Sequence, residues 1–596
     1  PISTCYSNTG TVKSKWATKL HALHSFYILT NTSRNLIMAT HTLICAILFS
    51  LVCNLLPLAA SADDPSTYTA FVRCMQRRTS SKDNIGGLIY SNANSSFSSV
   101  LTAYIRNKRF ESPSTSKPLL ILTANKISHL QAAVLCAQQA APGYTLKVRS
   151  GGHDYDGLSY TSTSPFLIVD MFNLRAISID WKSKTAWVQS GATLGEVYYR
   201  IANASNLFGF PAGLGPSVGV GGHFSGGGYG TLIRKYGLSS DNIIDAKVID
   251  AKGRLLDRKR MGEDFFWAIN GGGGGSFGIV VSYKINLVAV PATVTVFRLE
   301  QYADENAASM LFQWQKVAPT TNNDLFMRIL LQQTTSRTTK SAKTIKVSVL
   351  ALYLGGADSL VQLLTTQLPS LGLTKADCKE MTWLQSVLWW ANYEPTDSPT
   401  VLLSRTPSYN YLKRKSDYVT TPISEANLNA TFDKLAAVGK MGMVFNAYGG
   451  KMAEISPSAT PFSHRAGFLY KIQYSDTWKE AGSAADDDNI GRMREMYTFM
   501  TPLVSKNPRS SFFPYRDVDI GVMPPGQNSL AVGRVYGEKY FGGNFDRLVK
   551  IKTAVDPKNF FHNEQSIPTL VNLEVSGAQP TLIKVVIFFL WMIIEG

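Results

Sequence analysis

Three glycine-rich segments, all between residues 149 and 278, most constrain how this chain can fold. The first runs from Arg149 to Gly157, the second from Gly213 to Gly230 with glycine at nine of its eighteen positions, and the third from Gly271 to Gly278. Glycine loses more conformational entropy on folding than any other residue, so an ordered glycine run needs a compensating contact. Close approach of the backbone to a large, anionic ligand provides one. Tight turns alone explain one such segment more readily than three.

The third segment has the spacing of a dinucleotide-binding fingerprint at Gly273, Gly275 and Gly278. In a Rossmann site this fingerprint opens a helix. Here the following residues, Ile279 to Leu287, alternate and are rich in β-branched side chains, which predicts a strand. We therefore reject a Rossmann site.

The rest of the chain alternates β-type runs with helical runs, which predicts an α+β fold. With 45% hydrophobic and 17% charged residues, the composition is that of a packed globular protein, and it excludes disorder, collagen, coiled coil and a polytopic membrane protein. We expect strands at 119–122, 166–169, 324–332 and 343–354, helices at 127–139, 358–368 and 489–503, and hairpins at 176–189 and 243–256. Because the glycine segments all precede Pro291, we place a domain boundary near 291.

The first 62 residues hold four basic and no acidic residues. Within them, 38–62 joins an apolar run to an Ala-Ser-Ala ending, which is typical of a signal peptide, with a membrane anchor as the alternative. We interpret 1–37 as an upstream extension. The segment 570–596 contains a short apolar run, which we interpret as a tail of unclear status, with a membrane or lipid anchor as the alternative.

Removal of the signal peptide leaves three cysteines in an oxidising compartment, which allows one disulfide and one free thiol. We expect a secreted glycoprotein in the extracellular space or cell wall, with the vacuole as the alternative. Three glycosylation sequons fit that compartment, at Asn94, Asn203 and Asn429.

The net charge is strongly positive, with 59 Lys and Arg against 42 Asp and Glu, or +17. Such a balance suggests nucleic acid, an anionic surface or acidic polysaccharide as a partner. Export and the lack of a binding module exclude nucleic acid. We expect a monomer that works among acidic cell-wall polysaccharides, and no bound metal.

Several motifs together carry a resemblance to a known family. They are the segments 149–157, 210–230, 241–245, 507–509, 515–519 and 556–561. From about Tyr68 to Pro568 the chain resembles plant berberine bridge enzyme-like FAD-linked oxidoreductases, which belong to the vanillyl-alcohol-oxidase (PCMH-type) flavoprotein superfamily. The resemblance implies a PCMH-type FAD-binding domain (63–290), a substrate domain with an antiparallel sheet over the flavin (291–505), and a segment that returns to the FAD domain (506–569).

The resemblance also implies how FAD is held. The family histidine that matches His153 is bonded covalently to the flavin 8α-methyl carbon. Members with a second link carry cysteine where this chain has Gly215, so we expect a single link; Asn270, where the family usually has arginine, is a milder departure. Cys74 and Cys136 are expected to form the disulfide, leaving Cys378 free. The implied cofactor-binding residues are Arg149, Ser150, Gly151, Gly152, His153, Asp154, Gly215, Val218, Gly221, Gly222, Gly228, Tyr229, Gly230 and Ile279.

An alcohol-oxidising flavoenzyme needs a base for the hydroxyl proton. Alternation along 465–474 puts Lys471 and Gln473 on one face of a probable strand, and a lysine near a phenol favours phenolate. By resemblance to monolignol oxidoreductases, and less closely to carbohydrate oxidases, Tyr229 is the base, Lys471 activates it, and Tyr155, Gln473 and Tyr515 hold the substrate. In cannabinoid-cyclising relatives the residue matching Tyr515 is the base, so both tyrosines stay candidates. A Lys471 that merely lies on a solvated face is the alternative.

The resemblance also bears on the electron acceptor. Val218 matches a position where valine leaves room for oxygen at the flavin, whereas leucine or isoleucine closes it. The sequence thus predicts a secreted FAD-dependent oxidase that takes hydride from a monolignol-type allylic alcohol, or from the anomeric carbon of an oligosaccharide, and forms hydrogen peroxide. The alternatives are an oxidative cyclase, against which Gln473 argues because alkaloid-cyclising members have glutamate there, and a low-turnover, flavin-carrying defence or allergen-like protein.

Overall fold

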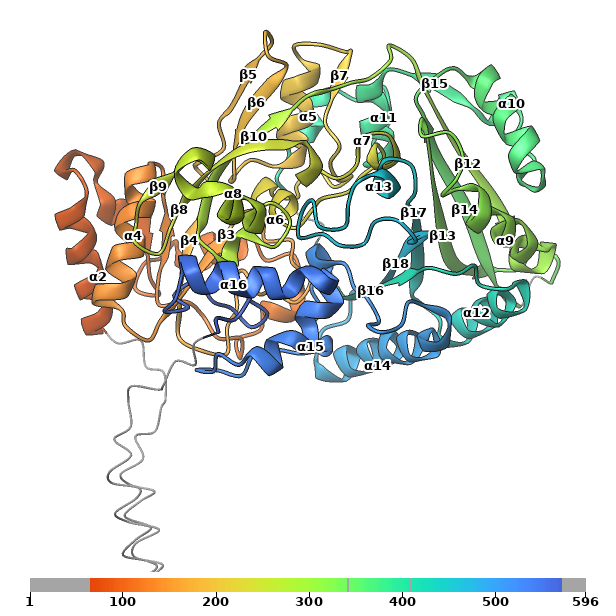
Figure 1. The fold of residues 1–596 in the computed structure, drawn as a ribbon. Helices are drawn as coiled ribbons and strands as arrows, with labels where there is room; N and C mark the ends of the chain where they lie inside the picture. The colour runs from red at the N-terminus through yellow and green to blue at the C-terminus, as the bar shows by residue number, and fades with distance from the viewer. Residues whose placement is uncertain (1–64, 340–341, 407–408, 571–596) are drawn as a thin grey trace, which may run out of the picture. The chain divides into compact units, whose positions relative to one another are not determined.

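The computed structural model describes residues 65–339, 342–406 and 409–570 (Figure 1). By contact, the chain falls into two units, 1–62 and 63–596. The predicted extension and signal peptide lie outside the described residues, as does the predicted tail beyond Leu570. No helix in the described part of the chain has the length and apolar character needed to cross a membrane.

Helices and strands alternate along the chain, and most of the strands form three main sheets. This confirms the predicted α+β class. The predicted division of 63–569 into three parts stays a prediction. The helices are α2 (Pro65–Arg78), α3 (Phe97–Thr102), α4 (Ile127–Ala140), α5 (Leu194–Ala202), α6 (Val220–Ser225), α7 (Ile233–Tyr236), α8 (Arg258–Ile269), α9 (Ala307–Val317), α10 (Ala357–Gln367), α11 (Trp383–Trp390), α12 (Glu425–Val438), α13 (Lys451–Glu454), α14 (Ser483–Phe499), α15 (Leu530–Phe541) and α16 (Phe545–Val555).

The first sheet is small and mostly parallel, with the order β1–β2–β4–β3. Its strands are β1 (Ile89–Tyr90), β2 (Ile121–Thr123), β3 (Thr145–Arg149) and β4 (Phe166–Asp170). All of β4 is buried, because Leu167 and Val169 pack with α2 and α4 while Phe166 and Ile168 pack with α3. A strand that is covered on both faces has a continuous apolar sequence, which explains the strand predicted at 166–169.

The second sheet is antiparallel, with the order β5–β6–β10–β8–β9. Its strands are β5 (Ile177–Asp180), β6 (Thr185–Gln189), β8 (Ile243–Ile249), β9 (Leu255–Leu256) and β10 (Ile279–Asn286), and a separate pair joins β7 (Phe208–Gly209) to β11 (Val288–Ala289). The hairpins β5–β6 and β8–β9 confirm those predicted at 176–189 and 243–256. Because the third glycine segment leads directly into β10, the rejection of a Rossmann site is confirmed.

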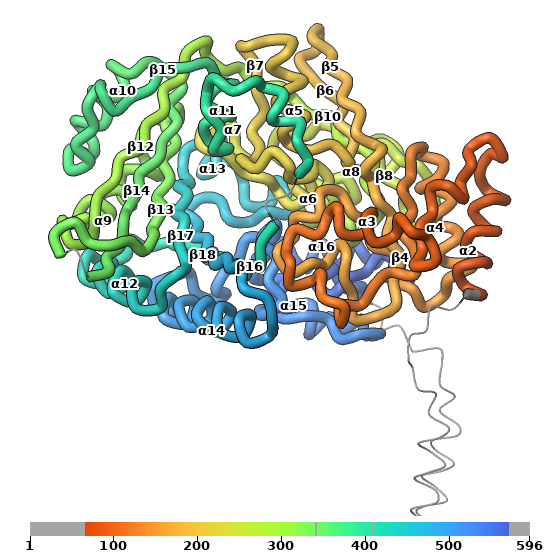
Figure 2. Tube along the Cα trace, turned by 180° about the vertical axis from the view of Figure 1, so that it is seen from behind, coloured from red at the N-terminus to blue at the C-terminus, as the bar shows by residue number. Residues whose placement is uncertain are grey.

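The third sheet has seven antiparallel strands in the order β15–β12–β14–β13–β17–β18–β16. They are β12 (Val294–Tyr302), β13 (Leu325–Thr335), β14 (Lys343–Tyr353), β15 (Lys379–Met381), β16 (Tyr411–Val419), β17 (Gly442–Ala447) and β18 (Tyr470–Trp478). Helices α9, α10 and α12 line one side of this sheet in Figures 1 and 2, and α14 shares their buried cluster. On β18, Tyr470, Ile472 and Tyr474 pack in that cluster. Lys471 and Gln473 face the other way, as the alternation predicts.

The C-terminal part of the described chain packs against earlier elements. Phe545 of α16 shares a buried cluster with Phe265 of α8. The ammonium of Lys552, also on α16, donates to the carbonyl of Ser276 at 2.7 Å, in the third glycine segment. Helix α16 therefore helps to hold the third glycine segment in place.

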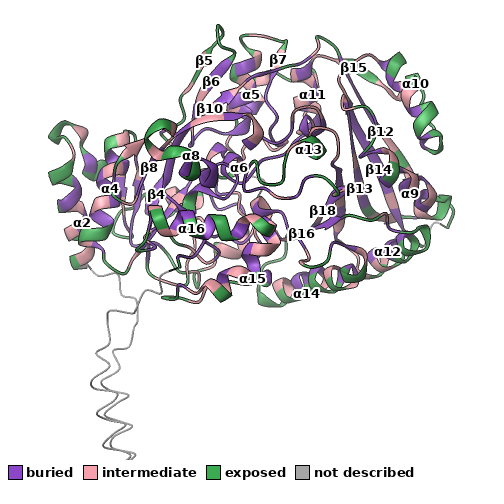
Figure 3. Ribbon diagram, in the orientation of Figure 1, coloured by how far each residue is buried: buried purple, intermediate pink, exposed green. Residues whose placement is uncertain are grey.

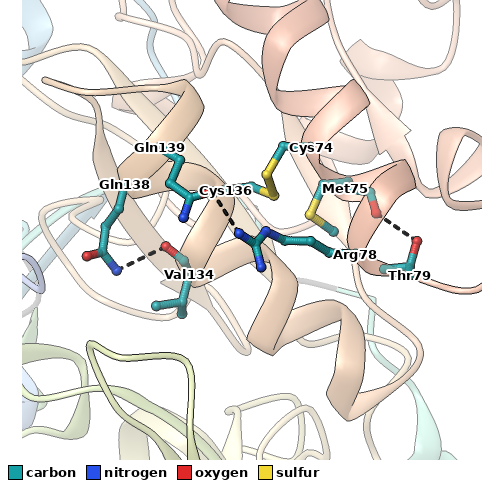
Figure 4. The surroundings of a disulfide bond; sticks show 8 residues. All are labelled: Cys74, Met75, Arg78, Thr79, Val134, Cys136, Gln138 and Gln139. Atoms are coloured by element: carbon teal, nitrogen blue, oxygen red, sulfur yellow. Dashed lines mark hydrogen bonds between the residues drawn. A yellow bond between two sulfur atoms is a disulfide. The ribbon is translucent and has the colours of Figure 1, made fainter.

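A disulfide between Cys74 and Cys136 joins α2 to α4 (Figure 4). The predicted pairing is thus confirmed, and Cys378 is the free cysteine of the described residues. Beside the bridge, the guanidinium of Arg78 donates to Gln139 Oε1 at 2.8 Å. Figure 3 shows the strands of the third sheet buried and the outer faces of α10, α12 and α14 exposed.

Candidate active site

All three glycine segments border one cavity of about 530 Å³. Side chains from β13, β16 and β18, and from residues 512–516, also line it. Of the predicted site residues, those that line it are Ser150, Gly151, Gly152, His153, Asp154, Tyr155, Gly215, Val218, Gly221, Gly222, Tyr229, Gln473 and Tyr515.

The first two glycine segments meet backbone to backbone. A Cβ atom on Gly151 would lie 2.3 Å from the amide nitrogen of Gly219, and one on Gly219 would lie 2.3 Å from that of Gly151. Gly152 adopts a φ of +63°, and a Cβ atom there would lie 2.1 Å from the carbonyl oxygen of Tyr104. A side chain at Gly151 or Gly219 would push the two segments apart. One at Gly152 would clash with Tyr104, and the positive φ there also favours glycine.

The cradle suits a dinucleotide with a pyrophosphate. Among the hydrogen bonds of the described residues, the backbone N–H groups of Gly152, His153 and Asp154 donate to no protein acceptor. Glycines at 222 and 275 border the cavity, where a Cβ atom would meet nothing within 4 Å. Free N–H groups and absent side chains allow a phosphate to approach the backbone. The residues present therefore fit FAD.

His153 lies in the cavity wall with its Nε2 atom 3.1 Å from Ser217 Oγ. Burial lowers the pKa of His153 to about 3, and the charges of Arg106 and Arg414 act in the same direction. The imidazole is thus neutral, and a neutral ring keeps one nitrogen with a lone pair that can bond to carbon. His223 is also neutral, since burial lowers its pKa to about 3, but its Nε2 accepts the N–H of Gly213 at 3.0 Å.

Five predicted residues do not line the cavity. The guanidinium of Arg149 donates to Asp170 and to the carbonyls of Leu101 and Val100. Its side chain therefore anchors β3 and is not available to a cofactor. The other four are Gly228, Gly230 and Ile279, which pack behind the wall, and Lys471, which reaches the site through its ring contacts.

A cluster of phenols forms the far wall of the cavity. The hydroxyls of Tyr229 and Tyr515 share a hydrogen bond of 2.6 Å. Gln473 Nε2 donates to the Tyr155 hydroxyl at 2.6 Å, and the rings of Tyr155 and Tyr515 lie with their centroids 5.0 Å apart. The four side chains come from two glycine-segment loops, a strand and the 512–516 segment, so only the fold brings them together.

Lys471 lies beneath this cluster. Its Nζ atom lies 3.3 Å from the ring centroid of Tyr229, 3.6 Å from that of Phe512 and 4.3 Å from that of Tyr515. It has no hydrogen-bond partner among the described residues, and its exposed fraction is 0%. The alternative of a lysine on a solvated face is therefore wrong. An ammonium over π faces gains electrostatic stabilisation that is larger when water is excluded.

Burial sets the protonation of this cluster. It lowers the pKa of Lys471 well below its usual value. It raises the pKa of Tyr515 well above its usual value, with the neighbouring Tyr229 acting in the same direction, and also raises that of Tyr155. Tyr515 and Tyr155 thus keep their protons and can donate hydrogen bonds.

Two arginines on strands of the third sheet line the cavity, and sequence reasoning missed both. Arg328 on β13 donates through Nε to Asn446 Oδ1 at 2.7 Å. Arg414 on β16 donates to Ser475 Oγ at 3.1 Å and lies 4.8 Å from the ring centroid of Tyr155. Neither forms an ion pair with a carboxylate of the described residues. Alternation along their strands could have indicated their face, but no local motif marks them. Further missed lining residues are Lys147, His223, Phe512, Arg516, His562 and Asn563.

The three predicted glycosylation sequons lie outside the core. Asn94, Asn203 and Asn429 are all exposed. Their exposure is compatible with glycosylation, which stays a prediction.

Comparison with known proteins gives a consistent result. The family profile described as FAD binding domain matches residues 118–258, and that described as berberine and berberine like matches 511–568. Berberine bridge enzyme-like 19 from Arabidopsis thaliana is 54% identical over 521 residues, which cover 87% of this chain and 90% of that protein.

Solved structures agree with the sequence relatives. The Bermuda grass isoallergen BG60 is 46% identical with a TM-score of 0.78, and the match covers 84% of this chain and all of that one. Phl p 4, a grass pollen allergen with glucose dehydrogenase activity, is 41% identical with a TM-score of 0.79 over the same shares of the two chains. An isoleucine-to-valine variant of Phl p 4 is described as a glucose oxidase.

Proposed function

The chain belongs to the berberine bridge enzyme-like family of FAD-dependent oxidoreductases, and from this premise we propose that it is a secreted alcohol oxidase. The donor is a monolignol-type allylic alcohol or the anomeric carbon of an oligosaccharide, and the acceptor is O₂, which gives hydrogen peroxide. One observation carries the proposal. Tyr229 borders the same cavity as His153. The Nζ atom of Lys471 lies 3.3 Å from the centroid of the Tyr229 ring.

The cofactor is held by the glycine cradle and by one covalent bond to His153. FAD, when bound, supplies the hydride-accepting chemistry. Gly215 has no sulfur atom, so a second covalent link cannot form at this position. The neutral state of His153 supports the bond, because a protonated imidazole has no free lone pair.

The protein's own residues handle the proton. The substrate hydroxyl gives its proton to the phenolate oxygen of Tyr229 as the carbon loses hydride. Tyr515, which keeps its own proton, donates a hydrogen bond to that oxygen. Lys471 activates Tyr229 in this proposal when it carries a proton, because a cation against the ring favours the phenolate. Burial lowers the pKa of Lys471 and so disfavours the protonated amine in the resting protein.

The remaining polar residues orient the donor. Gln473 and Tyr155 are already hydrogen-bonded to each other at the cavity wall and offer further donors and acceptors to substrate hydroxyls. The guanidinium groups of Arg328 and Arg414 have no carboxylate partner among the described residues, and they suit a donor with many oxygen atoms. This lining supports an oligosaccharide somewhat more strongly than an allylic alcohol, and the glucose dehydrogenase activity of Phl p 4 points the same way.

The choice of O₂ as acceptor rests on Val218. This side chain lines the cavity, and the family position that it matches controls oxygen access. The Phl p 4 variant in which isoleucine becomes valine, a glucose oxidase, supports this assignment. We further propose a monomer that is exported to the extracellular space or cell wall, where its basic surface suits acidic polysaccharide.

Anaerobic flavin bleaching tests the proposal. The purified holoprotein is mixed with coniferyl alcohol, glucose, and neutral and acidic oligosaccharides, and absorbance near 450 nm is followed. Reduction by at least one donor, with peroxide release on admission of air, is expected. If none of the donors reduces the flavin, the proposal is wrong and the alternative of a flavin-carrying defence protein is favoured. An oxidative cyclase would instead tolerate loss of Lys471.

A further inference from the structure

A buried network of charges lies behind the phenol cluster, on the edge strand β16. The ammonium of Lys413 contacts Asp156 Oδ2 at 2.9 Å and Asp517 Oδ1 at 2.8 Å. All three side chains are at most 2% exposed. Lys415 adds ion pairs to Asp517 and Asp519 from the same side of the strand. Although burial opposes it, the charges of these aspartates raise the pKa of Lys413.

The two aspartates that accept hydrogen bonds from Lys413 each lie close in sequence to a cavity tyrosine. Asp156 directly follows Tyr155, and Asp517 follows Tyr515 by two residues. The two loops are further tied together, since Asp156 Oδ2 accepts the N–H of Val518 at 2.9 Å. One ammonium therefore binds both loops that carry Tyr155 and Tyr515, two of the three tyrosines of the phenol cluster.

A second, uncharged contact holds the same loop to the same strand. The side-chain amide of Asn107 donates to the carbonyl of Tyr155 at 2.9 Å and to that of Leu412 at 3.0 Å. Leu412 directly precedes Lys413. The loop of Tyr155 and Asp156 is thus tied to β16 at two adjacent residues, to Leu412 through the amide of Asn107 and to Lys413 through an ion pair.

We propose that Lys413 is a positioning residue for the reaction, acting through Asp156 and Asp517 to set Tyr155 and Tyr515 against the substrate. The inference rests on the proposed function. Buried ions that lose a partner relax strongly, because an uncompensated charge in a dry interior is costly. Catalytic groups must be held within about 0.5 Å of their productive positions, so such relaxation would be felt at the phenols.

The test compares Lys413→Met with a charge-compensated variant, Lys413→Met/Asp156→Asn. We expect the single variant to lower the rate constant of anaerobic flavin reduction by roughly tenfold or more. It should also lower the midpoint of thermal unfolding. The double variant removes one cation and one anion, so its unfolding midpoint should recover while reduction stays slow. Lys413→Arg keeps the charge and should recover part of the rate. This variant also serves as the test if Lys413→Met does not fold.

A matched control separates positioning from general destabilisation. Leu428→Ala truncates a fully buried side chain of α12, on the far face of the third sheet. It should lower the unfolding midpoint without changing the reduction rate. If the double variant regains both stability and rate, or if all Lys413 variants reduce flavin within about twofold of the parent, Lys413 is structural only and the proposal is overturned.

A second readout works without any substrate. Visible circular dichroism of the bound flavin reports the groups that surround it, and it should change in the two Lys413→Met proteins but not in Leu428→Ala. If no donor reduces the parent protein, the proposed function fails, and this spectrum still decides the role of Lys413. An unchanged spectrum in both Lys413→Met proteins would overturn that role.

Discussion

The phenolic oxygens of Tyr229 and Tyr515 lie 2.6 Å apart, although 286 positions separate the residues in the chain. The ammonium of Lys471 contacts the ring faces of both. Burial and the neighbouring phenol raise the pKa of Tyr515, and in the proposed mechanism its hydroxyl is the one that donates this hydrogen bond. Which of the two tyrosines is the base stays a prediction, and the proposal assigns that role to Tyr229.

Substitution of the proposed base gives the first prediction. Tyr229→Phe should lower the rate constant of flavin reduction by at least about tenfold, the range expected for loss of a positioned base. Tyr536→Phe serves as a control, because that buried hydroxyl bonds the carbonyl of Ser566 and does not line the cavity. Stopped-flow reduction measures both. Near-normal reduction of Tyr229→Phe would move the role to Tyr515.

The second prediction concerns Lys471 and pH. Below its lowered pKa, the folded protein carries the full cost of a buried cation. Between that pKa and about 10.4, the usual value, the unfolded chain binds a proton that the folded protein does not, so stability rises with pH. Lys471→Met should therefore be the more stable protein near neutral pH, by about 1 kcal/mol or more.

This stability gain should shrink as the pH approaches about 10.4, above which both states are neutral. Thermal unfolding of the parent and variant from pH 6 to pH 10 tests the sign. The same variant should reduce flavin slowly at every pH, since Tyr229 loses the lysine that the proposal assigns as its activator. A variant that is less stable than the parent at neutral pH would contradict the burial argument.

The covalent link gives the third prediction. His153→Ala should leave no flavin fluorescence on a denaturing gel, because no other residue is expected to hold the cofactor covalently. Persistence of that signal would refute the single link. Gly215→Cys should create a second flavin-bearing peptide in a tryptic digest. Its Cβ atom would lie 3.0 Å from Val218 Cγ2, so some adjustment of Val218 is expected.

Oxygen access gives the fourth prediction. Val218→Ile should slow reoxidation of the reduced protein by O₂ about tenfold, which corresponds to about 1.4 kcal/mol of added barrier. Anaerobic reduction should change little, because the added methyl group does not alter the phenol cluster. Mixing reduced protein with oxygenated buffer separates the two half-reactions. Equal reoxidation rates would remove the gating role of Val218.

The fifth prediction concerns the disulfide, which closes a loop of 62 residues. In the chain-entropy model, Cys74→Ser/Cys136→Ser should lose about 4 kcal/mol of unfolding free energy. Cys378→Ser is the matched control and should change stability little, because this thiol is free and only partly buried. Denaturant unfolding measures both. A loss below about 1 kcal/mol would show that the unfolded chain is already restricted near this loop.

Local sequence was sufficient for much of the fold. The run at 166–169 became β4 and the pattern at 127–139 became α4, because apolar periodicity is imposed by which faces are buried. Alternation on 465–474 also gave the correct face for Lys471 and Gln473. The predicted strand at 119–122 is shorter in the structure and begins at Ile121. Leu119 and Leu120 are nevertheless buried, and each makes a backbone hydrogen bond to β4, so the prediction differs only in where the strand begins.

The sequence by itself determined the glycine cradle and the strand face that carries Lys471 and Gln473, and its motifs carried the resemblance that implies FAD. Glycine spacing and side-chain alternation are short-range features of the sequence, and each of the motifs spans a short stretch of the chain. Only the tertiary structure decided that Tyr229 meets Tyr515, that Arg149 serves Asp170, and that Arg328 and Arg414 enter the cavity. Each of these contacts joins distant parts of the chain, and their energies depend on burial, which no local pattern specifies.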